Sequence, residues 1–169
     1  MRFSIHGGFL LLISVLQATL LNYIEILNVK PNLFLVYVLI LSFFCGKTEG
    51  AVLGGIYGFI LDIMIGRFLG MNALMFAATG YFTAYFCEKI LGNKNAFIIL
   101  IYTVVVSVFY ELIYHLFSFL IIGDVDFIYA LKDVIIIECL YNGFVAFLLY
   151  PLLRKLTNFM YADKGENIG

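Results

Sequence analysis

The sequence contains few charged residues. Asp, Glu, Lys and Arg make up 12% of the 169 residues, whereas soluble domains carry about 25%. Hydrophobic residues account for 64%, against about 45–50% in an ordinary domain. This balance excludes a soluble globular protein and indicates a chain that lies in membrane lipid. The formal net charge of −1 provides no basic stripe, so we expect no nucleic acid among its partners.

Cysteine is scarce as well, and motifs for catalysis are missing. Cys45, Cys87 and Cys139 form no CxxC pair and no cluster with histidine, so we expect reduced thiols and no metal site. Glu111 and His115 form ExxxH, which is not the HExxH of zinc hydrolases. No serine lies in a GxSxG turn. A zinc hydrolase therefore has little support, the usual serine nucleophile is absent, and no motif calls for a cofactor.

Apolar segments separated by polar residues predict six membrane-spanning helices. About 20 helical residues cross a bilayer core about 30 Å thick. The second segment is short for a span, since its residues cover only about 18 Å and need neighbours such as Pro31, Asn32 and Cys45. We expect one all-α transmembrane bundle at residues 1–160 and a flexible cytoplasmic tail at 161–169. The predicted spans are residues 3–21, 33–44, 50–65, 73–86, 96–122 and 134–153.

The basic residues predict the orientation of the bundle, because loops rich in Lys and Arg remain in the cytoplasm. Six spans with an internal N-terminus put Lys30, Arg67 and Lys132 outside. The same topology puts a larger set inside: Arg2, Lys47, Lys89, Lys94, Arg154, Lys155 and Lys164. We therefore expect both termini in the cytoplasm.

Several polar side chains lie within the apolar segments, where an unpaired charge is costly. At 1.5 Å per residue, most of them fall in the outer half of the membrane in the six-span topology. Two interpretations stay open: hydrogen bonds that join the helices, or a site that recognises a ligand or partner. No Lys or Arg lies within the spans, so desolvation favours neutral carboxyl groups unless His115 or Arg67 pairs with them. These polar residues are Gln17, Asp62, Glu111, His115, Glu138 and Asn142.

A row of small residues follows the third segment at four-residue spacing. Small residues at this spacing allow close backbone contact between membrane helices. The row packs either against a neighbouring span or against another membrane protein. Its members are Gly50, Gly54, Gly58, Asp62, Gly66 and Gly70.

Motifs along the chain resemble those of the rod shape-determining protein MreD family. They are Lys30–Leu33, the glycine row through Phe59 to Asp62, Gly70–Leu74, Glu138 with Asn142, and Tyr150–Arg154. The resemblance covers nearly the whole chain. The family favours aspartate after the proline of the second span, whereas this chain has Asn32.

The resemblance implies a non-catalytic subunit of the bacterial cell-elongation machinery in the inner membrane. Its partners would be MreC and, through it, MreB and the synthase pair of RodA and a class B penicillin-binding protein. The family also resembles the six-helix S-components of energy-coupling-factor vitamin transporters. We expect Asp62, Asn72, Glu138 and Asn142, with Gln17 and His115 at the same depth, to line an outward cavity or partner-binding surface. The alternatives are a vitamin-binding S-component and, third, an intramembrane hydrolase.

Overall fold

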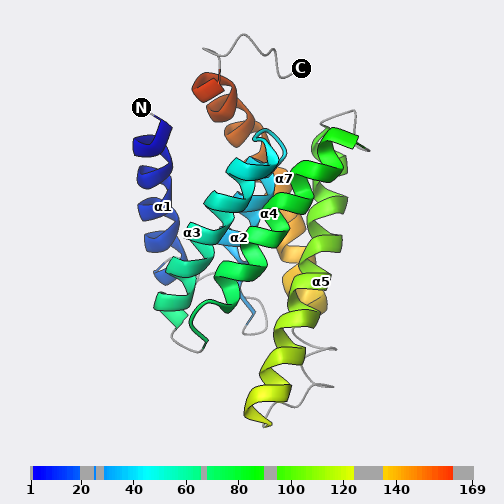
Figure 1. The fold of residues 1–169 in the computed structure, drawn as a ribbon. Coiled ribbons are helices and arrows are strands. Elements are labelled where there is room, and N and C mark those ends of the chain that lie inside the picture. Colours follow the sequence, from blue (N-terminus) through cyan, green and yellow to red (C-terminus); the bar gives the residue numbers. More distant parts are fainter. Residues whose placement is uncertain are drawn as a thin grey trace.

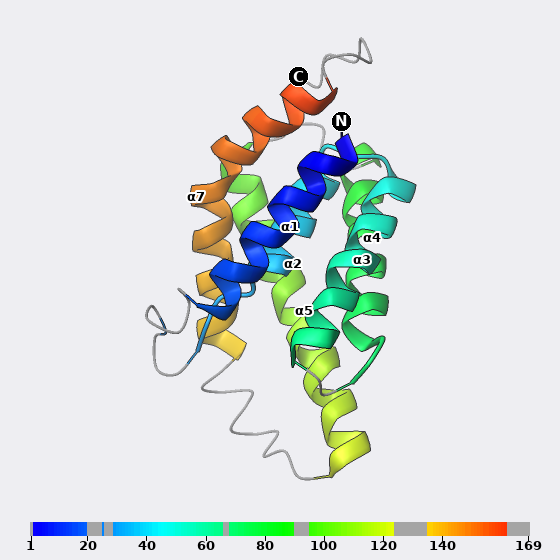
Figure 2. The same ribbon diagram turned by 90° about the vertical axis from the view of Figure 1, so that its left-hand side faces the viewer.

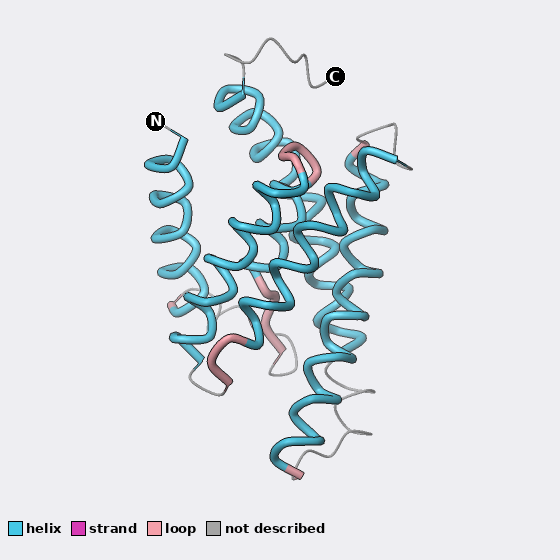
Figure 3. The backbone as a smooth tube through the Cα atoms, viewed as in Figure 1, coloured by secondary structure: helices cyan, strands magenta, loops and turns pink. Residues whose placement is uncertain are grey.

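The computed structural model describes residues 2–19, 25, 29–65, 68–89, 95–123 and 135–161. Within these ranges the chain is almost entirely helical and contains no strand (Figure 3). This agrees with the all-α fold that the apolar segments predict. The six helices of the described ranges are α1 (Arg2–Ala18), α2 (Leu33–Ser42), α3 (Lys47–Ile65), α4 (Met71–Lys89), α5 (Ala96–Ile122) and α7 (Ile136–Tyr161).

The helices run back and forth along one bundle. The start of α1 and the end of α7 lie at the same end of it, at the top of Figure 1. The strongest packing joins α3 to α4 and α5 to α7. Figure 2 shows α1 lying across one side of the bundle, in front of α2. The side of the bundle opposite to the chain termini therefore holds five helix ends: the last turns of α1 and α3 and the first turns of α2, α4 and α7.

Helix α2 is the centre of the core. All ten of its residues are buried, and it packs against α1, α3, α4, α5 and α7. A helix that is apolar on every side is stable only inside a protein or in lipid, and α2 is enclosed by protein. At 1.5 Å per residue it is only about 15 Å long. The short second segment is thus a central helix, ending at Ser42 rather than at Phe44 as predicted.

Helix α1 is joined to this core by a histidine and two tyrosines. The side chain of His6 is buried, and its Nδ1 lies 3.3 Å from the Tyr37 hydroxyl of α2. Tyr57 of α3 donates a hydrogen bond of 2.8 Å to the backbone carbonyl of His6. The rings of Phe9 and Tyr37 stack with centroids 5.7 Å apart. These contacts hold α1 against both α2 and α3.

The glycine row of α3 faces α4 at backbone contact. A Cβ atom added to Gly54 would overlap the carbonyl of Phe76, and one added to Gly58 would overlap the carbonyl of Asn72. At Gly50 the added atom would lie 2.9 Å from the carbonyl oxygen of Gly80. Close backbone approach is what small residues provide between membrane helices. Within the described residues, this part of the row is occupied by the packing of α3 on α4.

The rest of the predicted row does not continue this surface. Helix α3 ends at Ile65, and Gly66 lies outside the described residues. Gly70 lies in the turn before α4, with φ of 92° and open space around its α-carbon. That left-handed conformation favours glycine for the turn. The four-residue spacing from Asp62 to Gly70 is therefore no helical stripe, because the helix stops between them.

Two of the helices, α5 and α7, are long and apolar enough to cross a membrane by themselves. Helix α5 matches the predicted segment at 96–122. Helix α7 continues through Pro151 to Tyr161, beyond the predicted end at 153. Tyr161 thus belongs to the helix, and residues 162–169 of the expected tail lie outside the described residues.

Candidate functional site

Asp62, near the end of α3, holds the beginning of α4. Its Oδ2 accepts hydrogen bonds from the backbone N–H groups of Gly70 at 2.9 Å and Ala73 at 3.1 Å. Its Oδ1 accepts from the backbone N–H of Asn72 at 3.1 Å and from the Asn72 side-chain amide at 2.8 Å. The side chain is only 1% exposed. We call Asp62 and Asn72 the α4 cap.

The α4 cap satisfies donors that a helix leaves unpaired. The first N–H groups of a helix have no acceptor within it, and the positive end of the helix dipole favours an anion there. The first bond inside α4 runs from Leu74 to the carbonyl of Gly70, so the N–H groups of Asn72 and Ala73 need acceptors. Four donors around one carboxyl group suit its ionised form. Among the described residues, Asp62 is therefore bonded to the start of a helix. Arg67, a possible pairing cation in the sequence, lies outside the described residues, so that pairing stays a prediction.

Asn72 carries this network across to α5. Its side-chain amide donates to Asp62, and its Oδ1 accepts a hydrogen bond from the Tyr110 hydroxyl of α5. Asn72 and Tyr110 are both buried. An asparagine can donate and accept at once, which lets Asn72 join α3 to α5 through the first turn of α4.

A second set of polar side chains forms hydrogen bonds with the beginning of α2. The Asn142 Oδ1 of α7 accepts from the backbone N–H of Asn32 at 2.7 Å. The Gln17 Oε1 of α1 accepts from the backbone N–H of Leu33 at 3.0 Å. The Asn32 side chain accepts from the backbone N–H of Leu35 at 3.0 Å, as a helix N-cap does. We call Gln17, Asn32 and Asn142 the α2 cap.

Two carboxyl groups and a histidine lie beside these caps, between α5 and α7. Glu111 is buried and lies within hydrogen-bonding reach of Glu138. The Nε2 of His115 lies 3.6 Å from the Oε2 of Glu111, so the expected pairing one helical turn apart is present. A hydrogen bond between two carboxyl groups requires a proton on one of them. Among the described residues no three His, Cys, Asp or Glu side chains could jointly hold a metal ion.

One face of α5 connects the α2 cap, the α4 cap and the cluster of two carboxyl groups and a histidine. Ser107 accepts a hydrogen bond of 3.2 Å from the Asn142 side-chain amide, Tyr110 donates to the α4 cap, and Glu111 faces His115 and Glu138. The structure thus places the six predicted polar residues near the same end of the bundle, in separate groups. Sequence reasoning missed Ser107 and Tyr110, although both lie within one helical turn of Glu111.

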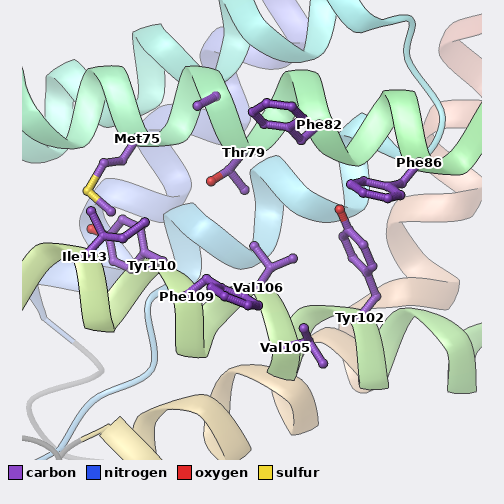
Figure 4. Close-up of a pocket in the computed structure, with 11 residues that line it drawn as sticks. Met75, Thr79, Phe82, Phe86, Tyr102, Val105, Val106, Phe109, Tyr110 and Ile113 are labelled. Carbon is purple, nitrogen blue, oxygen red and sulfur yellow. The ribbon is translucent and has the colours of Figure 1, made fainter.

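A lateral groove of about 540 Å³ separates α4 from α5. Figure 4 shows Met75, Phe82 and Phe86 of α4 across from Val105 and Phe109 of α5. Its lining is almost entirely apolar, and Tyr110 is part of it. We call this feature the α4–α5 groove. The same tyrosine that lines the groove therefore donates to the α4 cap.

A comparison with protein-family models matches residues 1–160 to the MreD family, which is described as rod shape-determining protein MreD. The chain belongs to the MreD family. Members of this family are membrane proteins with a role in rod shape determination, and the family is not known for enzyme activity. No curated protein and no solved structure gives a match.

Membership of the MreD family explains the surface of this chain and the bonding of its polar groups. Large apolar side chains are widely exposed on the helices, among them Leu74 at 75% and Leu120 at 68%, as expected of helices that face lipid. Lipid offers no hydrogen bonds to a helix end, so the backbone N–H groups there have to find their partners inside the protein. In this MreD-family chain the two caps supply those partners for α2 and α4.

Proposed function

We propose that this chain is a non-catalytic inner-membrane subunit of the bacterial cell-elongation machinery. It binds MreC and helps to organise peptidoglycan synthesis, with both termini in the cytoplasm. MreB, RodA and a class B penicillin-binding protein are its indirect partners. The observation that carries this proposal is the family match over residues 1–160, which includes every described helix except the last residue of α7.

The α4–α5 groove is the surface that we assign to MreC. Helix α4 packs mainly on α3, and α5 packs mainly on α7, so α4 and α5 leave an apolar cleft between them. In lipid, helices associate through close packing rather than through the hydrophobic effect. A cleft lined by aromatic and branched side chains offers such packing to a membrane-embedded segment of MreC.

The predicted polar residues act behind this surface rather than on it. Asp62 and Asn72 fix the first turn of α4, and Tyr110 links that turn to the wall of the groove. Gln17 and Asn142 fix α2, against which α4 and α5 pack. We therefore assign Asp62, Asn72, Gln17, Asn142, Glu138 and His115 the role of positioning α4 and α5 for the partner.

The vitamin-binding S-component is the weaker candidate. Such a role needs polar groups that turn toward a ligand. Here the side chains of Asn142 and Asp62 already accept hydrogen bonds from backbone N–H groups at helix ends. A hydrolase is weaker still, because hydrolysis needs an activated nucleophile or a metal.

Complementation in a rod-shaped bacterium tests the proposal. The gene for its MreD-family protein is deleted, and this chain is expressed with an affinity tag. We expect rounded cells to regain rod shape and MreC to copurify with the tagged chain from membranes. Rescue without MreC would contradict the proposed partner, and a well-folded chain that rescues nothing would contradict the proposed function.

A further inference from the structure

A second groove lies between the first turn of α5 and the last turns of α7, and has a volume of about 620 Å³. It is at the end of the bundle where α7 finishes, far from the two caps (Figure 1). Its lining includes Asn95 and Phe147, Leu148, Arg154, Lys155 and Asn158. We call it the α5–α7 groove.

The charge in this groove has one sign. Arg154 and Lys155 line it, and no acidic residue does. In the described part of the chain neither cation forms an ion pair with a carboxylate. By contrast, Lys47 at the same end of the bundle lies 2.7 Å from the carboxylate of Glu88. The α5–α7 groove therefore holds two positive charges that the described residues do not neutralise.

The backbone at the start of α5 adds to this positive field. Asn95 is the N-cap of α5 and has extended backbone angles, but its side chain makes no capping hydrogen bond. The first bond inside the helix reaches Ile99, which leaves the N–H groups of the first turn without acceptors in the helix. The positive end of the helix dipole lies there too.

The other half of the groove is apolar and open to lipid. Phe147 is 42% exposed and Leu148 is 56% exposed, and Pro151 lies between them and the cations along α7. A free phosphate would leave these side chains uncovered. A phospholipid covers them with an acyl chain while its phosphate meets the cations, as basic pockets between membrane helices do for anionic head groups.

We propose that the α5–α7 groove binds one anionic phospholipid. Its phosphate lies at Arg154 and Lys155, near the first turn of α5, and an acyl chain lies along Phe147 and Leu148. This site is separate from the α4–α5 groove that we assign to MreC. Lipid binding can therefore be tested without MreC, and its failure would leave the proposed function untouched.

The test measures lipid binding to the full chain in detergent by native mass spectrometry. Phosphatidylglycerol is the anionic probe and phosphatidylethanolamine the zwitterionic one. We expect tighter binding of phosphatidylglycerol and a loss of roughly fivefold in affinity for each cation removed in Arg154→Gln and Lys155→Gln. Lys89→Gln is the matched control, because Lys89 lies at the same end over the ring of Tyr85 and does not line the groove.

Arg154 also forms a side-chain hydrogen bond with Tyr150, so its replacement changes a contact within α7 as well as the groove. Lys155→Gln leaves that hydrogen bond in place and therefore separates lipid binding from a change in the fold. Equal binding of the two lipids, or an equal loss in Lys89→Gln, would overturn the proposal. Displacement of the lipid by inorganic phosphate at equal concentration would also overturn it, since it would mean that the acyl chain contributes nothing. A chain shortened after Tyr161 should keep its lipid preference; loss of that preference would mean that the polar tail, and not the groove, carries it.

Discussion

Asn142 of α7 accepts a hydrogen bond of 2.7 Å from the backbone N–H of Asn32, which lies 110 positions earlier in the chain. Its amide also donates to Ser107 of α5. One fully buried side chain thus joins the start of the central helix to both long helices. Gln17 contributes a second such contact from α1. The start of the core helix is thus held by side chains from two other helices, α1 and α7.

We expect Asn142→Ala to destabilise the protein more than Gln17→Ala does. An unsatisfied buried donor costs about 1–3 kcal/mol, and Asn142 is fully buried whereas Gln17 is half-buried. We predict losses of about 2 and about 1 kcal/mol respectively. The three buried cysteines allow the measurement: a thiol-reactive dye reports their exposure as the detergent-solubilised protein is heated. The reverse order of melting temperatures would contradict the α2 cap.

Asp62→Ala removes the acceptor of four hydrogen bonds at the start of α4. Because the lost acceptor is charged and buried, we expect a loss of about 3 kcal/mol or more. Glu88→Ala is the control: this acid is half exposed and pairs only with Lys47 in the described part of the chain. Exposed pairs contribute about 0–1 kcal/mol. The same melting assay measures both variants, and equal shifts would refute the role given to Asp62.

We predict opposite changes in stability when two adjacent glycines of α3 are replaced by alanine. Gly54→Ala forces a methyl group into the carbonyl of Phe76 and should cost about 2 kcal/mol through overpacking. The Cβ added in Gly55→Ala meets the Cβ of Ala77 at 3.7 Å and the carbonyl oxygen of Ala73 at 4.0 Å, both ordinary contact distances. This variant should be neutral or stabilising, because alanine favours helix. Melting curves of the two variants decide. If both lose stability equally, the close contact of α3 with α4 is not what the glycines provide.

The carboxyl pair between α5 and α7 predicts one proton shared by Glu111 and Glu138. Glu111 and Glu138 lie within hydrogen-bonding reach, and such a bond needs a protonated carboxyl group. Infrared spectra should contain the C=O band of that group, and the band should vanish in the double variant Glu111→Gln with Glu138→Gln. An unchanged band in the double variant would assign the proton to another residue.

The sequence was sufficient to predict the six helices of the described ranges, whereas the depth expected for the polar groups stays a prediction. Long apolar runs fixed α5 to the residue, and the four-residue spacing of Glu111 and His115 predicted their pairing. The row of small residues predicted a close helix contact but not its partner, α4. These features depend on residues near one another in the chain.

The partners of the polar groups could not be predicted, because they are backbone N–H groups of distant helices. Nothing local to Asn142 indicates that it faces Asn32. The position of Asp62 gives a weak signal of its role as a cap. The first N–H group from which it accepts a hydrogen bond is only eight residues later, at Gly70. A polar residue that closes one membrane helix just before a short turn can cap the next helix. The α4–α5 groove left no sequence signal, because apolar residues facing a cleft and facing lipid look alike.

The most direct measurement of the proposed function is the recovery of MreC with a chain whose α4–α5 groove is filled. Val105 lines the groove and is 47% exposed, so Val105→Trp should block it without disturbing the core. Leu140→Trp is the matched control on α7, 61% exposed and outside the groove. Both variants should melt like the unaltered chain. We predict that Leu140→Trp copurifies with MreC and restores rod shape, and that Val105→Trp does neither; full recovery of MreC with Val105→Trp would contradict the account.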